Sequence, residues 1–533
     1  MAAAAVTADL DRPTLAASIR CGNARTAAAT RCCGGCDTAP MALMYAGDER
    51  CHLGGRALMA KISTGPVVGK VTKTTARVLV DSAVPAQIRV ALQAVLNPAD
   101  AQAVIVETTQ ERPVRVASFS NLTPGTAYAI TLEVNGVVDD ERRGRLNTLP
   151  DNAHTAELLV MSCCDADYQD AHDMHETAYR THVASGSATL ALHIGDQVYG
   201  DQTFHGCVAA LKAQQAPAQW PAFTGWIKEQ YRTLYRRTWN VPGIRKLLAN
   251  TMNLMIWDDH EVTDDWADRG LFVDRNSAEH FVARCAWAVY REYQRQLWED
   301  VNDAPDAPYG VAEHHAHAFD WLGVLFVDNR GGRAFRPAPA LGSKPYLSPA
   351  QWGSIRAALG AGGTLANVRM LVVVTPVPLV FMGPKATANW DGDADDLWGH
   401  WSHDPYREEQ FEMLELLRTW KGAEPRREVV VVGGDVHIGG LLTICHREHR
   451  LGAETPIFRE LIASAVRRAP KGKTAFLGYS AGVKGDPLLF FQSPTFSYRV
   501  DDLRRRENFG VVTASIDAAG ALHTELSVVE ADE

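Results

Sequence analysis

Residues 188–202 read ATLALHIGDQVYGDQ, and this stretch decides the fold class of the chain. Its first half is a short apolar run, which is typical of a strand that is buried on both faces. Its second half places Asp196, Tyr199, Asp201 and Gln202 directly after that strand. A turn needs glycine and often one aspartate, but it does not need a tyrosine three residues after the aspartate. The stretch therefore predicts a buried strand that ends in a functional loop.

Three further apolar runs end in the same way. They are ELLVMS followed by CCDADYQD from residue 157, NLMIWDD followed by HEVTDDW from residue 253, and EVVVVGG followed by DVHIGG from residue 428. Ligands bind beyond the carboxyl ends of the strands in open α/β sheets. The four runs are therefore expected to bring one set of side chains together: Cys163, Asp196, Tyr199, Asp259, His260, Asp435 and His437.

Each of these residues has an ordinary structural alternative when it is taken alone. An aspartate after a strand is usually a turn residue or a helix cap, and a cysteine there is usually a small buried apolar residue. A histidine in such a place is more often a hydrogen-bonded structural residue than a ligand. Four coincident strand ends nevertheless favour a site, because the sequence WDDHE (257–261) would crowd buried charge without a compensating cation.

Two patterns divide the rest of the chain. Residues 61–149 carry short alternating apolar segments between turn sequences and contain no Cys or His, which predicts a small all-β sandwich with a structural or docking role. Residues 155–530 alternate fully apolar runs with amphipathic stretches, which predicts an α/β domain. Within it, helices are expected over 277–300 and 404–420, and a closing hairpin is expected over 509–529.

The composition is that of a globular protein of 533 residues, a length that predicts at least two domains. Lys and Arg number 53 and Asp and Glu number 63, so the net charge is −10 and no nucleic-acid-binding patch is expected. The sequence has no apolar run long enough for a transmembrane segment and no secretory signal pattern at its start. We therefore expect an intracellular or organellar location.

Residues 1–60 have the Ala, Thr and Gly content of a disordered tail. The sequence CCGGC (32–36) is a candidate for metal binding or lipidation, but no histidine or second cysteine pair completes a recognisable site around it. An organelle transit peptide is an alternative for the tail, although its acidic residues argue against one. Met59 is an alternative start of the chain.

The order GDxxY, DDHE and GDxH resembles the calcineurin-like metallophosphatases. The blocks SCC (162–164), GDQVY (195–199), IWDDHEV (256–262), VDNR (327–330) and GGDVHIGG (433–440) together resemble the alkaline phosphatase D (PhoD)-like family of that superfamily. The module that precedes them is also similar to the leading module of that family. The resemblance implies a two-sheet α/β/β/α metallophosphatase sandwich, preceded by the small all-β sandwich.

The resemblance also implies a role for each motif residue. Cys163, Tyr199 and His437 would bind a first metal, Asp259 and Asp435 would bind a second, and Asp196 would bridge the two. His260 would lie beside the substrate as a catalytic residue together with Asp196, and Glu261 would orient His260 or its loop from behind. Cys164 stands where the family has Gln, so it is an alternative to Cys163 as the ligand. The additional histidine of the superfamily is missing from this chain, and the corresponding strand end offers only Thr375.

These ligands predict the metals and the reaction. A thiolate, a phenolate, a carboxylate and an imidazole suit Fe³⁺, whereas the oxygen-only second set suits Ca²⁺, with Mn²⁺, Mg²⁺ or Zn²⁺ as alternatives. The resemblance implies that a metal-bound hydroxide hydrolyses small phosphomonoesters or phosphodiesters at this dinuclear centre. The alternative is a catalytically inactive PhoD-like scaffold or binding protein.

Two further polar clusters follow the apolar run of residues 321–328. Arg330, Arg333 and Arg336 are candidates for contact with substrate phosphate. The alternative for at least two of them is that they lie on a solvated loop without a role in binding. The stretch ANWDGDADDLWGHWSHD (388–404) has the length and composition of a substrate lid.

Overall fold

The computed structural model describes residues 61–532, except for 170–171, 214–215, 268–273, 302–311, 334–345, 382–398, 404, 450–451, 485–492 and 494. The tail of residues 1–60 therefore lies outside the described residues. No helix in the described part of the chain is long and apolar enough to cross a membrane.

Residues 64–147 form two antiparallel sheets of short strands. One has the strand order β1-β2-β5, and the other has the order β4-β3-β6-β7 with β8 paired to β6. Strand β3 shows the alternation that the sequence predicts, because Ile88, Val90 and Leu92 are buried while Gln87, Arg89 and Gln93 are exposed. The strand bounds are β1 Thr64–Val71, β2 Ala76–Asp81, β3 Ala86–Ala94, β4 Ala101–Thr108, β5 Val114–Phe119, β6 Ala127–Val134, β7 Val137–Val138 and β8 Gly144–Asn147.

A five-stranded sheet contains three of the four strand ends that the sequence singles out. Its order is β11-β10-β9-β19-β20, with β10 parallel to both β9 and β11 and with β19 antiparallel to both β9 and β20. All five residues of β10 and of β11 are buried, as their apolar sequences predict. The bounds are β9 Thr155–Met161, β10 Leu190–Ile194, β11 Met252–Ile256, β19 Asn508–Ile516 and β20 Leu522–Glu530.

A seven-stranded sheet contains the fourth strand end. Its order is β12-β13-β14-β15-β17-β16-β18, and β13, β14, β15 and β17 run parallel. The bounds are β12 His315–Phe319, β13 Leu322–Phe326, β14 Met370–Thr375, β15 Glu428–Gly433, β16 Gly439–His446, β17 Thr455–Ile462 and β18 Phe496–Arg504. The predicted α/β class is confirmed at this level, since both sheets mix parallel and antiparallel strands and helices connect several of them.

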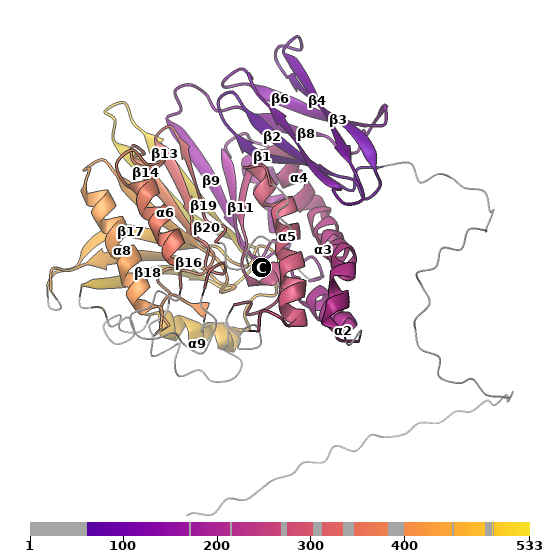
Figure 1. The fold of residues 1–533 in the computed structure, drawn as a ribbon. Coiled ribbons are helices and arrows are strands. Elements are labelled where there is room, and N and C mark those ends of the chain that lie inside the picture. The colour runs from indigo at the N-terminus through magenta and orange to yellow at the C-terminus, as the bar shows by residue number, and fades with distance from the viewer. Residues whose placement is uncertain are drawn as a thin grey trace, which may run out of the picture. The chain divides into compact units, whose positions relative to one another are not determined.

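Strand β15 shows why its sequence is continuously apolar. Val430 and Val432 belong to a core that also contains β9, β10 and β19, whereas Val429 and Val431 belong to a second core that contains residues of α6 and α8. Strands β16 and β17 also contact β20 of the five-stranded sheet. One face of the seven-stranded sheet therefore packs on the other sheet, and its opposite face packs under helices (Figure 1).

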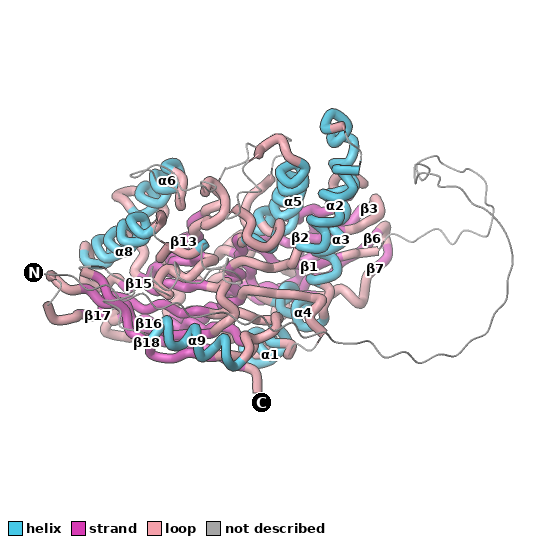
Figure 2. Tube along the Cα trace, turned by 90° about the horizontal axis from the view of Figure 1, so that it is seen from below, coloured by secondary structure: helices cyan, strands magenta, loops and turns pink. Residues whose placement is uncertain are grey.

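The helices form two groups. In both views α6 and α8 lie side by side, apart from α2, α3 and α5, which contact one another (Figures 1 and 2). Ser277 caps α5 and Ser348 caps α6, in each case by accepting a hydrogen bond from a backbone N–H of the first turn. The bounds are α1 Met174–Ala178, α2 Asp201–Ala213, α3 Thr224–Trp239, α4 Pro242–Asn250, α5 Ala278–Tyr293, α6 Pro349–Leu359, α8 Arg407–Gly422 and α9 Lys473–Lys484, with short non-α turns η1 Tyr179–Val183, η2 Pro217–Phe223, η3 Asp259–Glu261 and η5 Arg295–Leu297.

The two predicted helices and the predicted hairpin are present. The first predicted helix is shorter than expected, because α5 ends at Tyr293 and η5 follows it. On α5, Cys285 is buried and Phe281 is half-buried. The hairpin is formed by β19 and β20, and Gly520 in its turn has a φ of 78°, which glycine adopts without strain.

Candidate metal centre

Four loops meet at the carboxyl ends of β9, β10, β11 and β15. The loop after β9 is tied to the loop after β10, because the N–H of Cys163 donates to the carbonyl of Gly195 (3.3 Å) and the N–H of Cys164 donates to the carbonyl of Asp196 (2.8 Å). The two sheets are joined at the same edge, where the N–H of Val466 donates to the carbonyl of Ser162 (2.9 Å). Residues that are far apart in the sequence are thereby held within one loop cluster.

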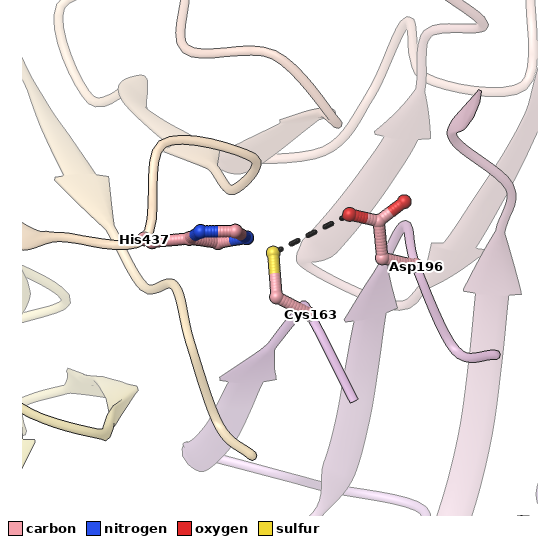
Figure 3. A group of neighbouring side chains, drawn as sticks. All are labelled: Cys163, Asp196 and His437. Carbon is pink, nitrogen blue, oxygen red and sulfur yellow. Dashed lines mark hydrogen bonds between the residues drawn. The ribbon is translucent and has the colours of Figure 1, made fainter. Parts of the chain in front are cut away.

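The first cluster consists of Cys163, Asp196 and His437, whose potential ligand atoms lie within 4.8 Å of one another. Figure 3 shows the three side chains converging from three separate loops. The Sγ atom of Cys163 lies 3.5 Å from Oδ2 of Asp196 and 3.0 Å from Oγ of Ser464. Ser464 also accepts a hydrogen bond from the N–H of His437 (2.9 Å), so a single hydroxyl contacts two of the candidate ligands.

Tyr199 joins this cluster through its hydroxyl group. That hydroxyl lies 3.4 Å from Oδ2 of Asp196 and 3.3 Å from Nε2 of His437. The phenol ring packs against the imidazole of His260, with ring centroids 4.0 Å apart, and the guanidinium of Arg468 lies 4.3 Å from the phenol centroid. The hydroxyl oxygen of Tyr199 therefore lies among the candidate ligand atoms, which explains why a tyrosine follows Asp196 in this loop.

The backbone at the candidate ligands is unusual. Cys163, Asp196, Asp435 and His437 have φ angles of 58°, 57°, 64° and 52°, in the left-handed region that residues with a Cβ atom seldom adopt. Such conformations cost of order 1–3 kcal/mol each, and they cluster at functional sites. The loops therefore hold these four side chains in place at an energetic cost.

A second cluster adjoins the first and shares Asp196 with it. It consists of Asp196, Asp258, Asp259 and Asp435, again with potential ligand atoms within 4.8 Å of one another. The guanidinium of Arg330 is buried among these acids: its Nε contacts Oδ1 of Asp258, and its NH2 lies 3.3 Å from Oδ1 of Asp259 and 3.8 Å from Oδ1 of Asp435. Arg330 is therefore placed as a partner of the acids of the second cluster.

Burial and mutual repulsion oppose the ionised forms of these groups. Burial raises the pKa of Asp196 well above its ordinary value, and Asp259 and Asp258 raise it further, although His260 counteracts them. Burial, together with the charge on Asp196, raises the pKa of the Cys163 thiol. Burial raises the pKa of Asp258 to about 7 against the opposing effect of Arg330. A donor set of this kind fits one or more bound cations, which would compensate the buried negative charge.

His260 lies between carboxylates. Its Nδ1 is 2.9 Å from Oδ2 of Asp201, and its Nε2 is 3.6 Å from Oδ1 of Asp264. Burial disfavours the imidazolium, but Asp196 and Asp259 nearby, together with the Asp201 contact, raise the pKa of His260 well above its ordinary value. The arrangement therefore favours a protonated His260 that Asp201 orients.

Glu261 connects two of the loops from behind. Its Oε2 accepts hydrogen bonds from the N–H of Asp196 (3.1 Å) and of Asp258 (2.8 Å), and its Oε1 accepts from the N–H of Gln197 (2.7 Å) and from Nε2 of Gln294 (2.9 Å). One buried carboxylate thus holds the loop after β10 against the loop after β11.

Several predicted residues lie elsewhere or have other partners. Cys164 is buried but belongs to none of the clusters that the described residues form, so the geometry places Cys163 rather than Cys164 at the site. The hydroxyl of Thr375 lies 2.8 Å from each of two acceptors within the protein, Oδ1 of Asn329 and the carbonyl of Val377. Arg333 donates to the carbonyl of Gly399 (2.9 Å) and packs on aromatic rings. Arg336 and residues 388–398 of the predicted lid lie outside the described residues.

The structure adds three residues to the predicted set. Asp258 was visible in the sequence as the first acid of DDHE, but the spacing gave no reason to prefer it. Asp201 was visible in the opening motif without a role. His400 lies in the predicted lid, and its Nε2 is 3.4 Å from Oδ2 of Asp435, which places an imidazole beside the second cluster. No local signal distinguished His400 from the other polar residues of that loop.

Comparisons with known proteins bear on the family and the fold of the chain. The sequence profile of the PhoD-like phosphatases matches residues 158–300. A solved structure of PhoD aligns with a TM-score of 0.60 at 14% identity, covering 88% of this chain and 92% of that one. Two solved structures match a smaller part of the chain. The first is a sensor domain of the anti-sigma factor RsgI4 of Pseudobacteroides cellulosolvens, at 17% identity and a TM-score of 0.15, covering 18% of this chain and 98% of that one. The second is an FN3 domain of human collagen XX, at 22% identity and a TM-score of 0.13, covering 16% of this chain and 88% of that one. No curated protein matches the sequence. The resemblance that the motifs predict is therefore confirmed: residues 158–300 match the PhoD-like phosphatase family, and the fold is similar to that of PhoD over most of the chain.

Proposed function

We propose that this protein is a metal-dependent hydrolase of phosphoric esters with a dinuclear metal centre. The observation that carries the proposal is the pair of adjoining clusters that share Asp196. One oxygen of Asp196 lies near Cys163 and Tyr199, and the other accepts a hydrogen bond from the N–H of His260, in the loop after β11. Asp196 is therefore oriented as a bridging ligand would be. The match to PhoD-like phosphatases supports the same reaction class.

The two clusters differ in chemistry, and so would their metals. Cys163, Tyr199 and His437 give the first site a thiolate, a phenolate and an imidazole, which together with a carboxylate suit Fe³⁺. Asp259 and Asp435 give the second site carboxylate oxygens, which suit Ca²⁺, with Mn²⁺, Mg²⁺ or Zn²⁺ as alternatives. When bound, a metal pair would activate water and withdraw charge from the phosphoryl oxygens.

His260 supplies the acid of the proposed reaction. Its contact with Asp201 through Nδ1 leaves Nε2 on the side of the imidazole away from that carboxylate. The contact with Asp201 favours the protonated imidazole, from which Nε2–H can donate to a phosphoryl oxygen or to the leaving oxygen of the ester. Tyr199, packed on the same imidazole, limits its rotation.

The domain organisation is proposed on the same basis. Residues 61–149 would form a small β-sandwich module, and residues 155–530 would form the metallophosphatase domain, in which the five-stranded and seven-stranded sheets make the two central layers of an α/β/β/α sandwich. The contacts of β16 and β17 with β20 and of α8 with β15 support this arrangement.

The test is phosphate release from the purified full chain after reconstitution with Fe³⁺ and Ca²⁺. An aryl phosphate monoester and a bis-aryl phosphodiester should be tried in parallel, since the proposal covers both ester classes. Hydrolysis of at least one, lost on chelation, supports the proposal. A protein that binds both metals and hydrolyses neither class would instead be an inactive PhoD-like scaffold.

A further inference from the structure

A buried polar path leads from the N-terminal sheets to the candidate metal centre. It begins at Asp81, the last residue of β2, whose carboxylate is inaccessible to solvent. Its Oδ2 accepts hydrogen bonds from Nε of Arg236 (2.6 Å) and from the hydroxyl of Tyr293 (2.9 Å), and its Oδ1 accepts from NH2 of Arg236 (3.1 Å). Arg236 lies on α3 and Tyr293 ends α5, so Asp81 fixes two helices of the α/β part.

The middle of the path is a rigid aromatic contact. The ring of Tyr293 stacks on the ring of Tyr235, with centroids 4.5 Å apart and planes at 10°, and Trp239 packs edge-on against both. Tyr293, Tyr235 and Trp239 are all buried. Stacked and edge-on rings at these separations are favourable contacts that hold each ring in one orientation. The carboxyl end of α5 is therefore fixed in position.

Gln294 follows Tyr293 directly and makes the last step. It is fully buried, and its Nε2 donates both to the hydroxyl oxygen of Tyr235 (3.1 Å) and to Oε1 of Glu261 (2.9 Å). Among the described residues, it is the side chain that donates to Glu261; the other three donors are the backbone N–H groups of Asp196, Gln197 and Asp258.

We propose that Gln294 is a positioning residue of the metal centre and that Asp81 anchors it through Tyr293. The carboxylate of Glu261 holds the loops that carry Asp196 and Asp258, so a side chain that fixes Glu261 also fixes both loops. Loss of an outer partner of this kind typically costs about 10–100-fold in metal affinity or activity. The N-terminal sheets would thus help to shape the centre although they contribute no ligand. This inference rests on the proposed metal-dependent function.

The test uses the full chain and four proteins: wild type, Gln294→Leu, Tyr293→Phe and Gln410→Leu. Gln410, on α8, is a matched control because it is also fully buried. Its Nε2 donates to the backbone carbonyl of Leu379 (2.6 Å) and not to Glu261. Each protein is loaded with Fe³⁺ and Ca²⁺. The rate of metal release to a chelator, kcat and KM for an aryl phosphate, and the thermal unfolding midpoint of the metal-free protein are then measured.

Gln294→Leu is expected to release metal at least about tenfold faster and to lower kcat at least about tenfold, with KM within about twofold of wild type. Tyr293→Phe should also speed metal release and lower kcat, each by about 2–5-fold. Gln410→Leu should lower the unfolding midpoint while metal release and kcat stay at the wild-type values. The contrast between the two Gln→Leu variants separates positioning from general stability.

The role of Gln294 is overturned if Gln294→Leu keeps the wild-type rate of metal release and kcat. It is also overturned if these two quantities change no more in Gln294→Leu than in Gln410→Leu. An effect of Gln294→Leu without any effect of Tyr293→Phe overturns the anchoring by Asp81. If Gln294→Leu does not fold, Gln294→Met is measured in its place, because it keeps the length of the side chain and removes the donor to Glu261. Tyr293→Phe, which removes one oxygen atom and keeps the stacked ring, then still decides the anchoring by Asp81. A wild-type protein without hydrolase activity contradicts the proposed function, whereas the metal-release comparison still decides this inference.

Discussion

Oδ2 of Asp196 lies 3.5 Å from Sγ of Cys163 and 3.4 Å from the hydroxyl of Tyr199, while Oδ1 accepts a hydrogen bond from the N–H of His260 (3.3 Å). The two oxygens of Asp196 therefore face different parts of the site. A carboxylate can bridge two cations in this orientation because each oxygen carries part of the negative charge.

Asp196→Asn should abolish phosphate release while leaving the fold intact. A neutral amide keeps the size of the side chain but bridges two cations poorly, so the loss should exceed the roughly 10–100-fold cost of losing an outer-shell partner. Activity, metal content and the circular dichroism spectrum of the variant check this. Near-normal turnover with an intact spectrum would remove Asp196 from the centre of the mechanism.

Tyr199→Phe should weaken or shift the visible absorption of the oxidised, iron-loaded protein. A phenolate on Fe³⁺ gives a ligand-to-metal charge-transfer band, and the substitution removes that ligand while keeping the ring that packs on His260. Absorption spectra of both proteins at equal iron content provide the measurement. A colourless wild-type protein with two zinc ions per chain would contradict the iron assignment and leave the hydrolase proposal standing.

Cys163→Ser should perturb the same iron site, and Cys164→Ser should not. The two cysteines are neighbours in the chain and both are buried, but only the Sγ of Cys163 belongs to the cluster with Asp196 and His437 among the described residues. Cys164→Ser is therefore the matched control for volume and chemistry. Equal loss of iron from both variants, measured by elemental analysis, would mean that the geometry does not separate the two thiols.

Glu460→Gln should remove part of the pH dependence of the protein's stability. Burial raises the pKa of Glu460 from 4.5 to about 8, against the hydrogen bonds that it accepts from the N–H groups of Leu379 and Val380. Because the folded-state pKa is the higher one, this group's contribution to stability is fully present below about pH 4.5 and is lost as the pH rises through about 8. Urea unfolding at pH 6 and pH 9 should show a smaller difference for the variant than for wild type; an unchanged difference would contradict the assignment.

Removal of residues 1–58, so that the chain starts at Met59, should leave metal content and kcat unchanged. The candidate ligands lie between residues 163 and 437, and the described core begins at Ile62. Hydrolysis and elemental analysis of the truncated and full chains make the comparison. Loss of metal from the truncated protein would show that CCGGC contributes to binding after all.

The sequence by itself determined the local features of the site. Short apolar runs identified β9, β10, β11 and β15 because strands buried on both faces are mostly apolar, and the polar residues that followed them identified the loops. The hairpin of β19 and β20 was also readable, since alternation and a glycine turn are local signals. Patterns of this kind depend only on residues that are close in the sequence, so they can be recognised without the tertiary structure.

Only the tertiary structure decided how those loops are held and which atoms face the centre. Cys163 and Cys164 are chemically identical, and the left-handed backbone at Cys163, with a φ of 58°, belongs to the folded loop rather than to any local pattern. The burial of Arg330 among acids, the approach of His400 to Asp435 and the path from Asp81 to Gln294 join residues that are distant in the sequence. Such contacts depend on how the sheets and helices pack, because a side chain far along the chain reaches the site only after the intervening elements have taken their places.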